Sequence, residues 1–154
     1  MKKIEITSLH ENVFETIGKE WMLVTAGTQE KYNTMTASWG CLGWLWNKPV
    51  AVIFIRPERY THQLIEGCDD LTLSFLGNSE EARKIYQFCG SKSGREKGRI
   101  TFQQARLTLE CHKLYKDTLK QENLIDKSLE QWYGDKKGGY HDVYVLEIES
   151  VYIP

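Results

Sequence analysis

The sequence predicts a mainly β fold, an antiparallel β-barrel with short peripheral helices. Several short segments alternate apolar and polar residues with the period of two that strands show, whereas helical segments are few and short. Strands and helices do not alternate regularly, which makes a doubly wound α/β fold the weaker alternative. The 154 residues contain no repeat or low-complexity stretch, so we expect one domain spanning residues 1–154.

Six segments have the pattern of strands. Residues 50–55 are continuously apolar after Pro49, as expected for a strand buried on both faces. The last segment changes phase, because Val143 and Val145 alternate with other residues and the apolar positions then continue at Ile148 and Val151. We predict strands at residues 21–26, 34–39, 50–55, 71–75, 107–111 and 143–151.

Three segments predict short helices, at residues 58–66, 80–88 and 124–132. The second has the clearest boundaries, because Ser79 is a favourable N-cap, Glu80 and Glu81 lie in the first turn, and Gly90 follows the end. The helices follow no repeating order, so we place them at the periphery of the barrel.

Composition argues against several classes of protein. Lys and Arg number 20 against 21 Asp and Glu, a net charge of −1, which disfavours binding of nucleic acid or anionic lipid through bulk charge. The longest apolar run, at residues 50–55, is far shorter than the ~20 residues of a membrane-spanning helix. The first residues lack the apolar core of a secretory signal. We therefore expect a soluble, cytoplasmic protein.

The cysteines, at positions 41, 68, 89 and 111, are too widely spaced for a structural zinc site or a dithiol redox motif. We expect four reduced thiols that pack as small apolar side chains. The four histidines are scattered along the chain and form no ligand cluster, so we predict no metal.

The first candidate binding segment is residues 33–40. Its Asn, Thr and Ser side chains offer amide and hydroxyl groups, and Ala37 and Gly40 would let a ligand approach the backbone closely. The alternative is an edge strand whose hydroxyl groups face water.

The second candidate segment is residues 56–61, directly after the most apolar strand. Pro57 suits the first position of a helix, and Arg56, Arg59 and Thr61 would then lie at a helix N-terminus, which favours phosphate. The alternative is that the two arginines pair with Glu58 or Glu66 at the surface.

The third candidate segment, residues 91–99, contains four cations, one anion, two glycines and two serines. Glycines let backbone N–H groups converge on an anion that Lys and Arg neutralise, and a solvated loop is the alternative. Two basic, hydroxyl-rich segments in a chain of net charge −1 together favour a small phosphorylated ligand. Trp39, Trp44 and Trp46 add the hypothesis of a planar ring partner, or of packing in the core or at a subunit interface.

Taken in order, these segments resemble the flavin reductase-like family, which includes flavoredoxin. The resemblance rests on residues 32–40, 45–50, 55–61, 73–75, 89–95 and 141–148 and extends from about Trp21 to Val151. It implies the FMN-binding split β-barrel, antiparallel and of Greek-key type, and a homodimer with one FMN per subunit near the interface. Trp44 departs from the pattern, because it adds bulk near the expected flavin ring.

The resemblance also implies where FMN would bind. The strand at residues 33–39 would lie against the isoalloxazine ring, the segment at residues 56–61 near the ribityl phosphate, residues 74 and 75 on the neighbouring strand, and the third basic segment around the anion. The implied cofactor-binding residues are Asn33, Thr34, Met35, Thr36, Ala37, Ser38, Trp39, Arg56, Arg59, Tyr60, Thr61, Ser74, Phe75, Ser93, Gly94, Arg95 and Lys97.

The implied function is an oxidoreductase that passes electrons from NAD(P)H or a protein donor through FMN to an acceptor. FMN carries this chemistry itself, in keeping with a sequence that offers no convincing catalytic triad or carboxylate pair. The alternative is a non-catalytic electron carrier that uses the same site. An oligonucleotide-binding barrel is a third hypothesis, disfavoured by the balanced charge.

Overall fold

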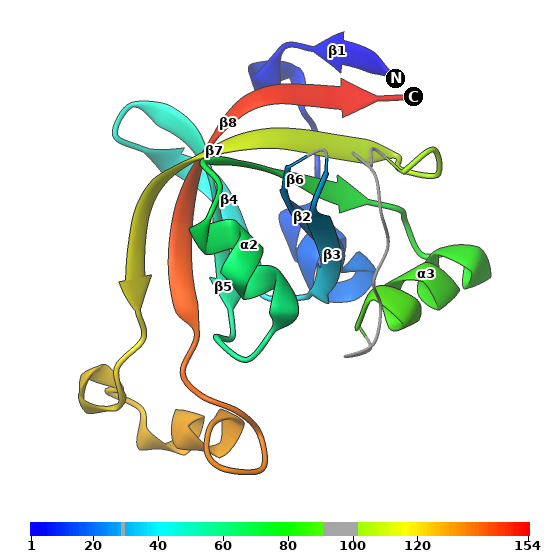
Figure 1. Ribbon diagram of the computed structural model, residues 1–154. Helices are drawn as coiled ribbons and strands as arrows, with labels where there is room; N and C mark the ends of the chain where they lie inside the picture. Colours follow the sequence, from blue (N-terminus) through cyan, green and yellow to red (C-terminus); the bar gives the residue numbers. More distant parts are fainter. Residues whose placement is uncertain (29, 91–101) are drawn as a thin grey trace.

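The computed structural model describes residues 1–28, 30–90 and 102–154, and its strands form one antiparallel sheet (Figure 1). All six predicted strands are present. Two more were not predicted: β1 has only three residues, and β4 carries two glycines, which are unfavourable in strands. The strands are β1 (Lys2–Ile4), β2 (Met22–Gly27), β3 (Tyr32–Ala37), β4 (Gly40–Leu45), β5 (Lys48–Ile55), β6 (Asp70–Phe75), β7 (Leu107–Thr118) and β8 (Asp142–Ile153).

The strand order confirms the predicted barrel. The order in the sheet is β3-β2-β6-β7-β8-β5-β4, and β1 also pairs with β8. β3 and β4 stand at opposite ends of this order, yet only Ser38 and Trp39 separate them in the chain, so the sheet must curl until its ends meet. β5 lies beside β8 rather than β6, which is a Greek-key arrangement.

β7 and β8 are the longest strands and lead from the barrel into an arm, residues 119–141 (Figure 1). Their register changes from Glu110 opposite Ser150 to Cys111 opposite Ile148, so Glu149 is the extra residue of a bulge. Tyr144, Leu146 and Ile148 face the core before the bulge and Val151 after it, so the strand does change phase, but after Ile148 rather than between Val145 and Ile148 as predicted. The arm contains two short 3₁₀ helices, η3 (Gln121–Asn123) and η4 (Lys127–Trp132).

The predicted helices are present with changed boundaries. The helix expected at residues 58–66 begins two residues later as α2 (Tyr60–Glu66), and α3 (Glu80–Gly90) includes the glycine expected beyond its end. The hydroxyl of Ser79 accepts a 3.1 Å hydrogen bond from the Ala82 amide, as predicted for an N-cap. The helix expected at residues 124–132 is wrong in its start and type: Asp126 accepts a bond from the Ser128 amide, and the shorter η4 follows it.

Two apolar clusters organise the described residues. The larger lies inside the barrel and includes the fully buried Leu73, Leu109 and Leu146. The smaller lies between β2 and α3, around Leu23 and Tyr86. It holds α3 against the barrel.

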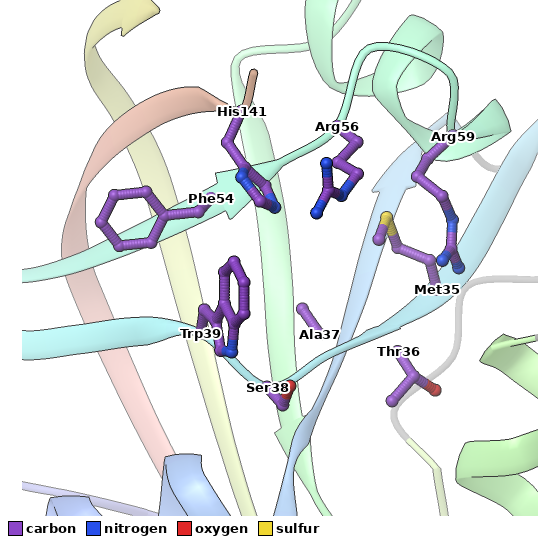
Figure 2. A pocket seen from close by; sticks show the side chains of 9 residues that line it. All are labelled: Met35, Thr36, Ala37, Ser38, Trp39, Phe54, Arg56, Arg59 and His141. Atoms are coloured by element: carbon purple, nitrogen blue, oxygen red, sulfur yellow. The ribbon is translucent and has the colours of Figure 1, made fainter. Parts of the chain in front are cut away.

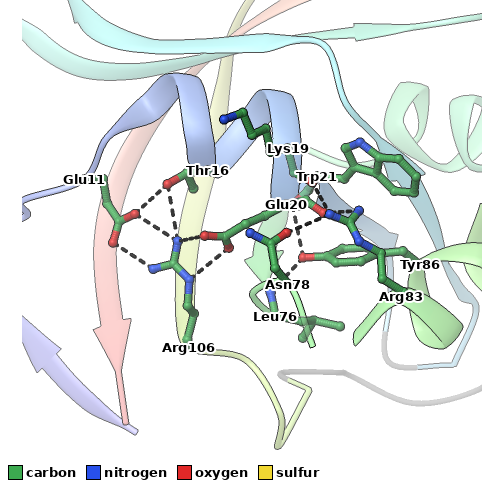
Figure 3. A network of polar contacts seen from close by, with 10 residues as sticks. All are labelled: Glu11, Thr16, Lys19, Glu20, Trp21, Leu76, Asn78, Arg83, Tyr86 and Arg106. Atoms are coloured by element: carbon green, nitrogen blue, oxygen red, sulfur yellow. Dashed lines mark hydrogen bonds and ion pairs between the residues drawn. The ribbon is translucent and has the colours of Figure 1, made fainter. Parts of the chain in front are cut away.

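A polar network fixes the N-terminal segment to the barrel (Figure 3). This segment comprises η1 (Ile6–Ser8), α1 (Val13–Glu15) and the π-helical turn η2 (Thr16–Glu20). The Arg106 guanidinium, just before β7, donates to Glu11 Oε1 at 2.8 Å and to Glu20 Oε1 at 2.7 Å. Trp21 follows with a φ of 83°, a strained value for a non-glycine residue. The Tyr86 hydroxyl donates to the Trp21 carbonyl at 3.0 Å, which stabilises that conformation.

All four cysteines are free thiols, as predicted. Cys89 and Cys111 are buried, but Cys41 is exposed, so the expectation that every thiol packs as an apolar side chain is wrong there. Cys41 lies on β4, an end strand of the sheet, where one face meets water. No helix among the described residues has the length and apolar character needed to cross a membrane.

Candidate functional site

Two cavities lie side by side between β3, the end of β5 and the start of α2. The smaller has a volume of about 200 Å³ and the larger about 660 Å³. Met35, Arg56 and Arg59 line both, so the cavities are adjacent. Figure 2 shows the smaller cavity, which is lined by Met35, Thr36, Ala37, Ser38, Trp39, Phe54, Arg56, Arg59 and His141.

Strand β3 forms the shared wall, and its polar side chains are held by internal hydrogen bonds. Asn33 Nδ2 donates to Thr61 Oγ1 at 2.9 Å, and the hydroxyls of Thr25 and Thr34 share a 2.8 Å bond. Thr36 Oγ1 donates to the Tyr86 carbonyl at 2.6 Å. The alternative of hydroxyls facing water is therefore wrong for these residues, because β3 is covered by α2 and α3.

Beyond these bonded side chains, β3 presents small groups to the smaller cavity. Ala37 and Ser38 line it, and they lie where the chain leaves β3 for β4. A small methyl and a hydroxyl leave the backbone accessible to a flat ligand there. This agrees with the interpretation of Ala37 as a place where a ligand could approach the main chain, but Gly40 lines neither cavity, and a Cβ there would lie 2.8 Å from Met22 Cε and from the Val52 carbonyl oxygen.

Arg56 is engaged by the arm rather than by a carboxylate. Its Nη1 donates to the Gly139 carbonyl and its Nη2 to the Trp132 carbonyl, both at 2.9 Å. The guanidinium carbon also lies 5.1 Å from the centre of the Tyr133 ring. The alternative of an Arg56 pair with Glu58 or Glu66 has no support among the described ion pairs, and the arginine instead holds the arm.

Arg59 is the cation that remains at the junction of the two cavities. It is half-buried, and burial lowers the pKa of Arg59 from its ordinary value, although a guanidinium stays charged at neutral pH. No described carboxylate forms an ion pair with it. A partly desolvated cation beside an open cavity favours an anionic ligand.

Aromatic rings close the other side of the smaller cavity. Trp39 packs edge-on against Trp132 with ring centres 5.5 Å apart, and its ring centre lies 5.1 Å from that of His141. The pKa of His141 is lowered to about 4, chiefly by burial and further by the nearby Arg56 charge, so its imidazole is neutral at pH 7. His141 Nδ1 shares a 2.9 Å hydrogen bond with the Tyr133 hydroxyl.

The structure brings most of the predicted site residues together. One set lines one or both cavities: Asn33, Thr34, Met35, Thr36, Ala37, Ser38, Trp39, Arg56, Arg59, Tyr60 and Thr61. Ser74 and Phe75 do not join them; both are fully buried in β6, and Ser74 Oγ lies 3.5 Å from Thr108 Oγ1. Ser93, Gly94, Arg95 and Lys97 lie outside the described residues.

Several lining residues were not predicted. Phe54 and His141 line the smaller cavity, and Glu58, Gln63, Cys89 and the arm residues Asp135, Lys136, Lys137 and Gly138 line the larger. The arm residues carry a signal like that of residues 91–99, because two lysines stand between glycines. His141 had no comparable signal as an isolated histidine.

A separate polar cluster joins α2 to β7 and β8. His62 Nε2 is 2.6 Å from Asp142 Oδ2, and Glu66 lies beside them, so one histidine does meet two carboxylates, contrary to the expectation of no cluster. The ammonium of Lys116 is 3.0 Å from Glu66 Oε1 and 3.4 Å from Asp142 Oδ2. A resident cation therefore balances these carboxylates, and the absence of a metal stays a prediction.

Comparison with protein families decides which family this is. The model of the flavin reductase like domain matches residues 14–154. The chain belongs to the flavin reductase-like family. Comparison with curated proteins gave no significant match.

Solved structures in the same fold class support the assignment of the fold. Flavoredoxin from Methanosarcina acetivorans is 19% identical with a TM-score of 0.63, covering 98% of this chain and 76% of its own. The FMN-binding protein from Thermus thermophilus with bound p-hydroxybenzaldehyde is 19% identical with a TM-score of 0.62, covering 100% and 82%. A Streptomyces globisporus NADH:FAD oxidoreductase in complex with NAD and FAD fragments is 18% identical with a TM-score of 0.62, covering 88% and 74%.

The predicted family and the predicted split β-barrel are therefore confirmed. In this flavin reductase-like domain, the smaller cavity lies where the chain passes from β3 to β4, the two ends of the sheet, and the larger cavity is adjacent to it along β3. The residues that a flat, anionic ligand requires are gathered at that point: small groups on β3, an aromatic wall, and the Arg59 cation.

Proposed function

We propose that this protein is an FMN-dependent oxidoreductase that binds the cofactor across the two adjacent cavities. The observation that carries the proposal is the shape and charge of this space, an aromatic wall at one end and an arginine with no described carboxylate partner at the junction. Together the cavities fall within the range of volumes that cofactor sites occupy. Family membership supports the same ligand class.

Different residues suit different parts of the ligand. Trp39, Ala37 and Ser38 suit the flat ring system, because they offer an aromatic face and accessible main chain. Arg59 suits the phosphate, because a half-buried guanidinium forms strong charge-assisted bonds to phosphate oxygens. Arg56, which was also expected to bind phosphate, lines both cavities, and two of its N–H groups donate to carbonyl groups of the arm.

Bound FMN would supply the redox chemistry, accepting and releasing electrons at its ring. The chain's own side chains would bind and orient it and exclude water from one face. His141 is neutral at pH 7, so it would add a polar but uncharged group beside the ring. We propose NAD(P)H as the electron donor; the NADH:FAD oxidoreductase among the similar structures favours a nicotinamide over a protein donor.

Two measurements test this function. The absorption spectrum of the purified protein, with and without added FMN, should show a bound flavin; protein that takes up no FMN at micromolar concentration contradicts the proposal. Anaerobic mixing of the FMN-loaded protein with NADH or NADPH should bleach the flavin band within seconds. Flavin that binds but is not bleached by either nucleotide would indicate an electron carrier.

We also propose a homodimer, as the resemblance implied, in a cytoplasmic protein. The hairpin between β4 and β5 leaves Trp44 63% and Trp46 56% exposed, with Leu45 between them. Exposed apolar patches of this kind favour contact with another protein surface. Light scattering should give twice the mass of the chain, and a Trp44→Ser, Trp46→Ser double variant should give the monomer mass. A wild-type monomer at working concentration would contradict the dimer.

A further inference from the structure

The arm ends in a closed turn, residues 134–138, that borders the larger cavity. The Gly134 and Gly138 backbones pair, with N-to-O distances of 3.1 and 2.8 Å, and the lysines and Asp135 occupy the tip. Lys137 Nζ donates to the Gln131 carbonyl within the arm. Lys136 lines the cavity and has no ion pair with any described residue.

Arg56 and Glu58 clamp this turn to the start of α2. Arg56 donates to the carbonyls of Trp132 and Gly139, and Glu58 Oε1 accepts from the Gly139 amide at 2.5 Å. Arg56 and Glu58 therefore bind the carbonyl and the amide of Gly139, although they lie about 80 positions earlier in the chain. Charge-assisted hydrogen bonds to its backbone give a defined position to this exposed turn.

Gly138 fits this clamp because it has no side chain. A Cβ at position 138 would overlap Glu58 Oε1 and would lie 3.3 Å from Arg56 Cδ, and the φ of 99° also favours glycine. Gly134 has a φ of 119° but faces open space. The two glycines thus have the same backbone requirement, and only Gly138 touches the clamp.

The charge around the larger cavity is positive although the chain is not. Arg56, Arg59, Lys136 and Lys137 line it against only Glu58 and Asp135, in a chain of net charge −1. Arg59 stands on the wall formed by α2 and Lys136 on the wall formed by the arm. An anion in the cavity would meet a cation from each side.

We propose that the turn at residues 134–138 is the second wall of the phosphate site, with Lys136 binding the flavin phosphate opposite Arg59. Arg56 and Glu58 are positioning residues that hold the turn across the cavity. This inference rests on the proposed function, because it takes the anion to be the phosphate of the bound flavin nucleotide.

The first test compares FMN with riboflavin, which lacks the phosphate. Removing the Lys136 charge by Lys136→Gln should weaken FMN binding about fivefold, as for an exposed charge pair, and leave riboflavin binding unchanged. Asp135→Asn should act in the opposite direction and tighten FMN binding. Lys127→Gln is the matched control, since Lys127 is exposed on the same arm and lines neither cavity.

The second test separates positioning from direct contact by a double-mutant cycle with Arg56→Ala and Lys136→Gln. If Arg56 acts through the turn, its loss should weaken FMN binding much less once Lys136 is gone. Independent, additive effects would overturn the positioning role. Arg56→Ala should reduce the preference of the protein for FMN over riboflavin, and Gly138→Ala should reduce it in the same way. Gly134→Ala should leave that preference unchanged.

The outcomes are distinguishable from failure of the proposed function. A wild-type protein that binds neither FMN nor riboflavin refutes flavin binding itself. If the wild type binds both ligands but Lys136→Gln and Lys127→Gln have the same FMN affinity, the flavin function stands and the second wall of the phosphate site is refuted. Circular dichroism of each variant confirms that the change in affinity belongs to a folded protein.

Discussion

Asn33 Nδ2 donates a 2.9 Å hydrogen bond to Thr61 Oγ1, and this bond joins strand β3 to helix α2. Both residues are buried and line the larger cavity. The same Asn33 amide also donates to the Thr34 carbonyl at 3.3 Å. The wall that the strand and the helix form together therefore depends on one side-chain amide.

Loss of the Thr61 hydroxyl should loosen this wall. Thr61→Val keeps the shape of the side chain but leaves a buried Asn33 donor short of an acceptor, which costs about 1–3 kcal/mol. Urea unfolding should show this loss, and FMN affinity should fall with it. Thr72→Val on β6 is the control, because the Thr72 hydroxyl bonds to no other described residue; equal losses in the two variants would contradict the role of the bond.

Arg106 stabilises the N-terminal segment through Glu11 and the buried Glu20. Arg106→Gln leaves the Glu20 carboxylate buried without its cation, and we expect a loss of about 2–3 kcal/mol in the free energy of unfolding. This is the low end for a broken buried pair, since Arg106 itself is one-third exposed. Lys19→Gln, which removes the exposed pair with Glu15, should change stability by less than about 0.5 kcal/mol.

The same network should contribute to acid sensitivity. The hydrogen bond from Arg106 holds the pKa of Glu11 below its ordinary value of 4.5, so the folded state favours the charged carboxylate. Its stabilisation is present above the unfolded pKa and is lost as the pH falls from about 4.5 through the lowered pKa. Urea unfolding between pH 5 and 3 should show a steeper decline for the wild type than for Arg106→Gln; parallel declines would contradict this assignment.

His141 should act in a higher pH window. Its pKa is lowered from 6.5 to about 4 by burial, so between these values the unfolded chain binds a proton that the folded chain does not. Stability should therefore fall as the pH decreases from about 6.5 to 4, with a slope of up to about 1.4 kcal/mol per pH unit. His141→Gln should flatten this part of the curve. An NMR titration that gives His141 a pKa near 6.5 would contradict the expectation directly.

Tyr86 connects three elements through one hydroxyl. It accepts a 2.8 Å bond from the Leu76 amide and donates to the Trp21 carbonyl, and its ring is fully buried. Tyr86→Phe should cost about 1–3 kcal/mol, because the Leu76 amide is left buried without an acceptor. Tyr152→Phe removes only an exposed bond to Glu110 and should be nearly neutral. Similar unfolding midpoints for the two variants would show that the buried hydroxyl is dispensable.

The strands were predictable because their signal is local. Alternation and the apolar run at residues 50–55 identified six strands, although the change of phase at the Glu149 bulge was predicted a few residues too early. β4 was not predicted because it carries two glycines and no polar side chain, so its sequence shows no alternation of apolar and polar residues. Its position in the sheet is determined by its pairing with β5, and a local sequence pattern does not predict which strands pair.

The candidate site was predictable where one segment carries its chemistry, as at residues 33–39 and 56–61. Arg56 lines both cavities, and its bonds to the arm could not be predicted because its partners are backbone carbonyls, which every residue type has. Ser74 and Phe75 were grouped with the site by resemblance, but both are fully buried on β6 and line neither cavity, since Phe75 packs in the barrel core and Ser74, on the opposite face of the strand, lies beside Thr108. His141 and Lys136 line the cavities because the arm folds back toward α2, and no local pattern predicts this fold of the arm.

The position of β8 also determines when the barrel can be completed. β8 pairs with β1, β5 and β7, so each of these three earlier strands lacks one neighbour until β8 is present. β5 can pair with β4 at once, but its other edge must wait for a partner more than 80 residues downstream. During translation the newborn chain therefore leaves one edge of its most apolar strand unpaired until β8 has been synthesised, and in the cell that interval is when chaperones would have to shield it.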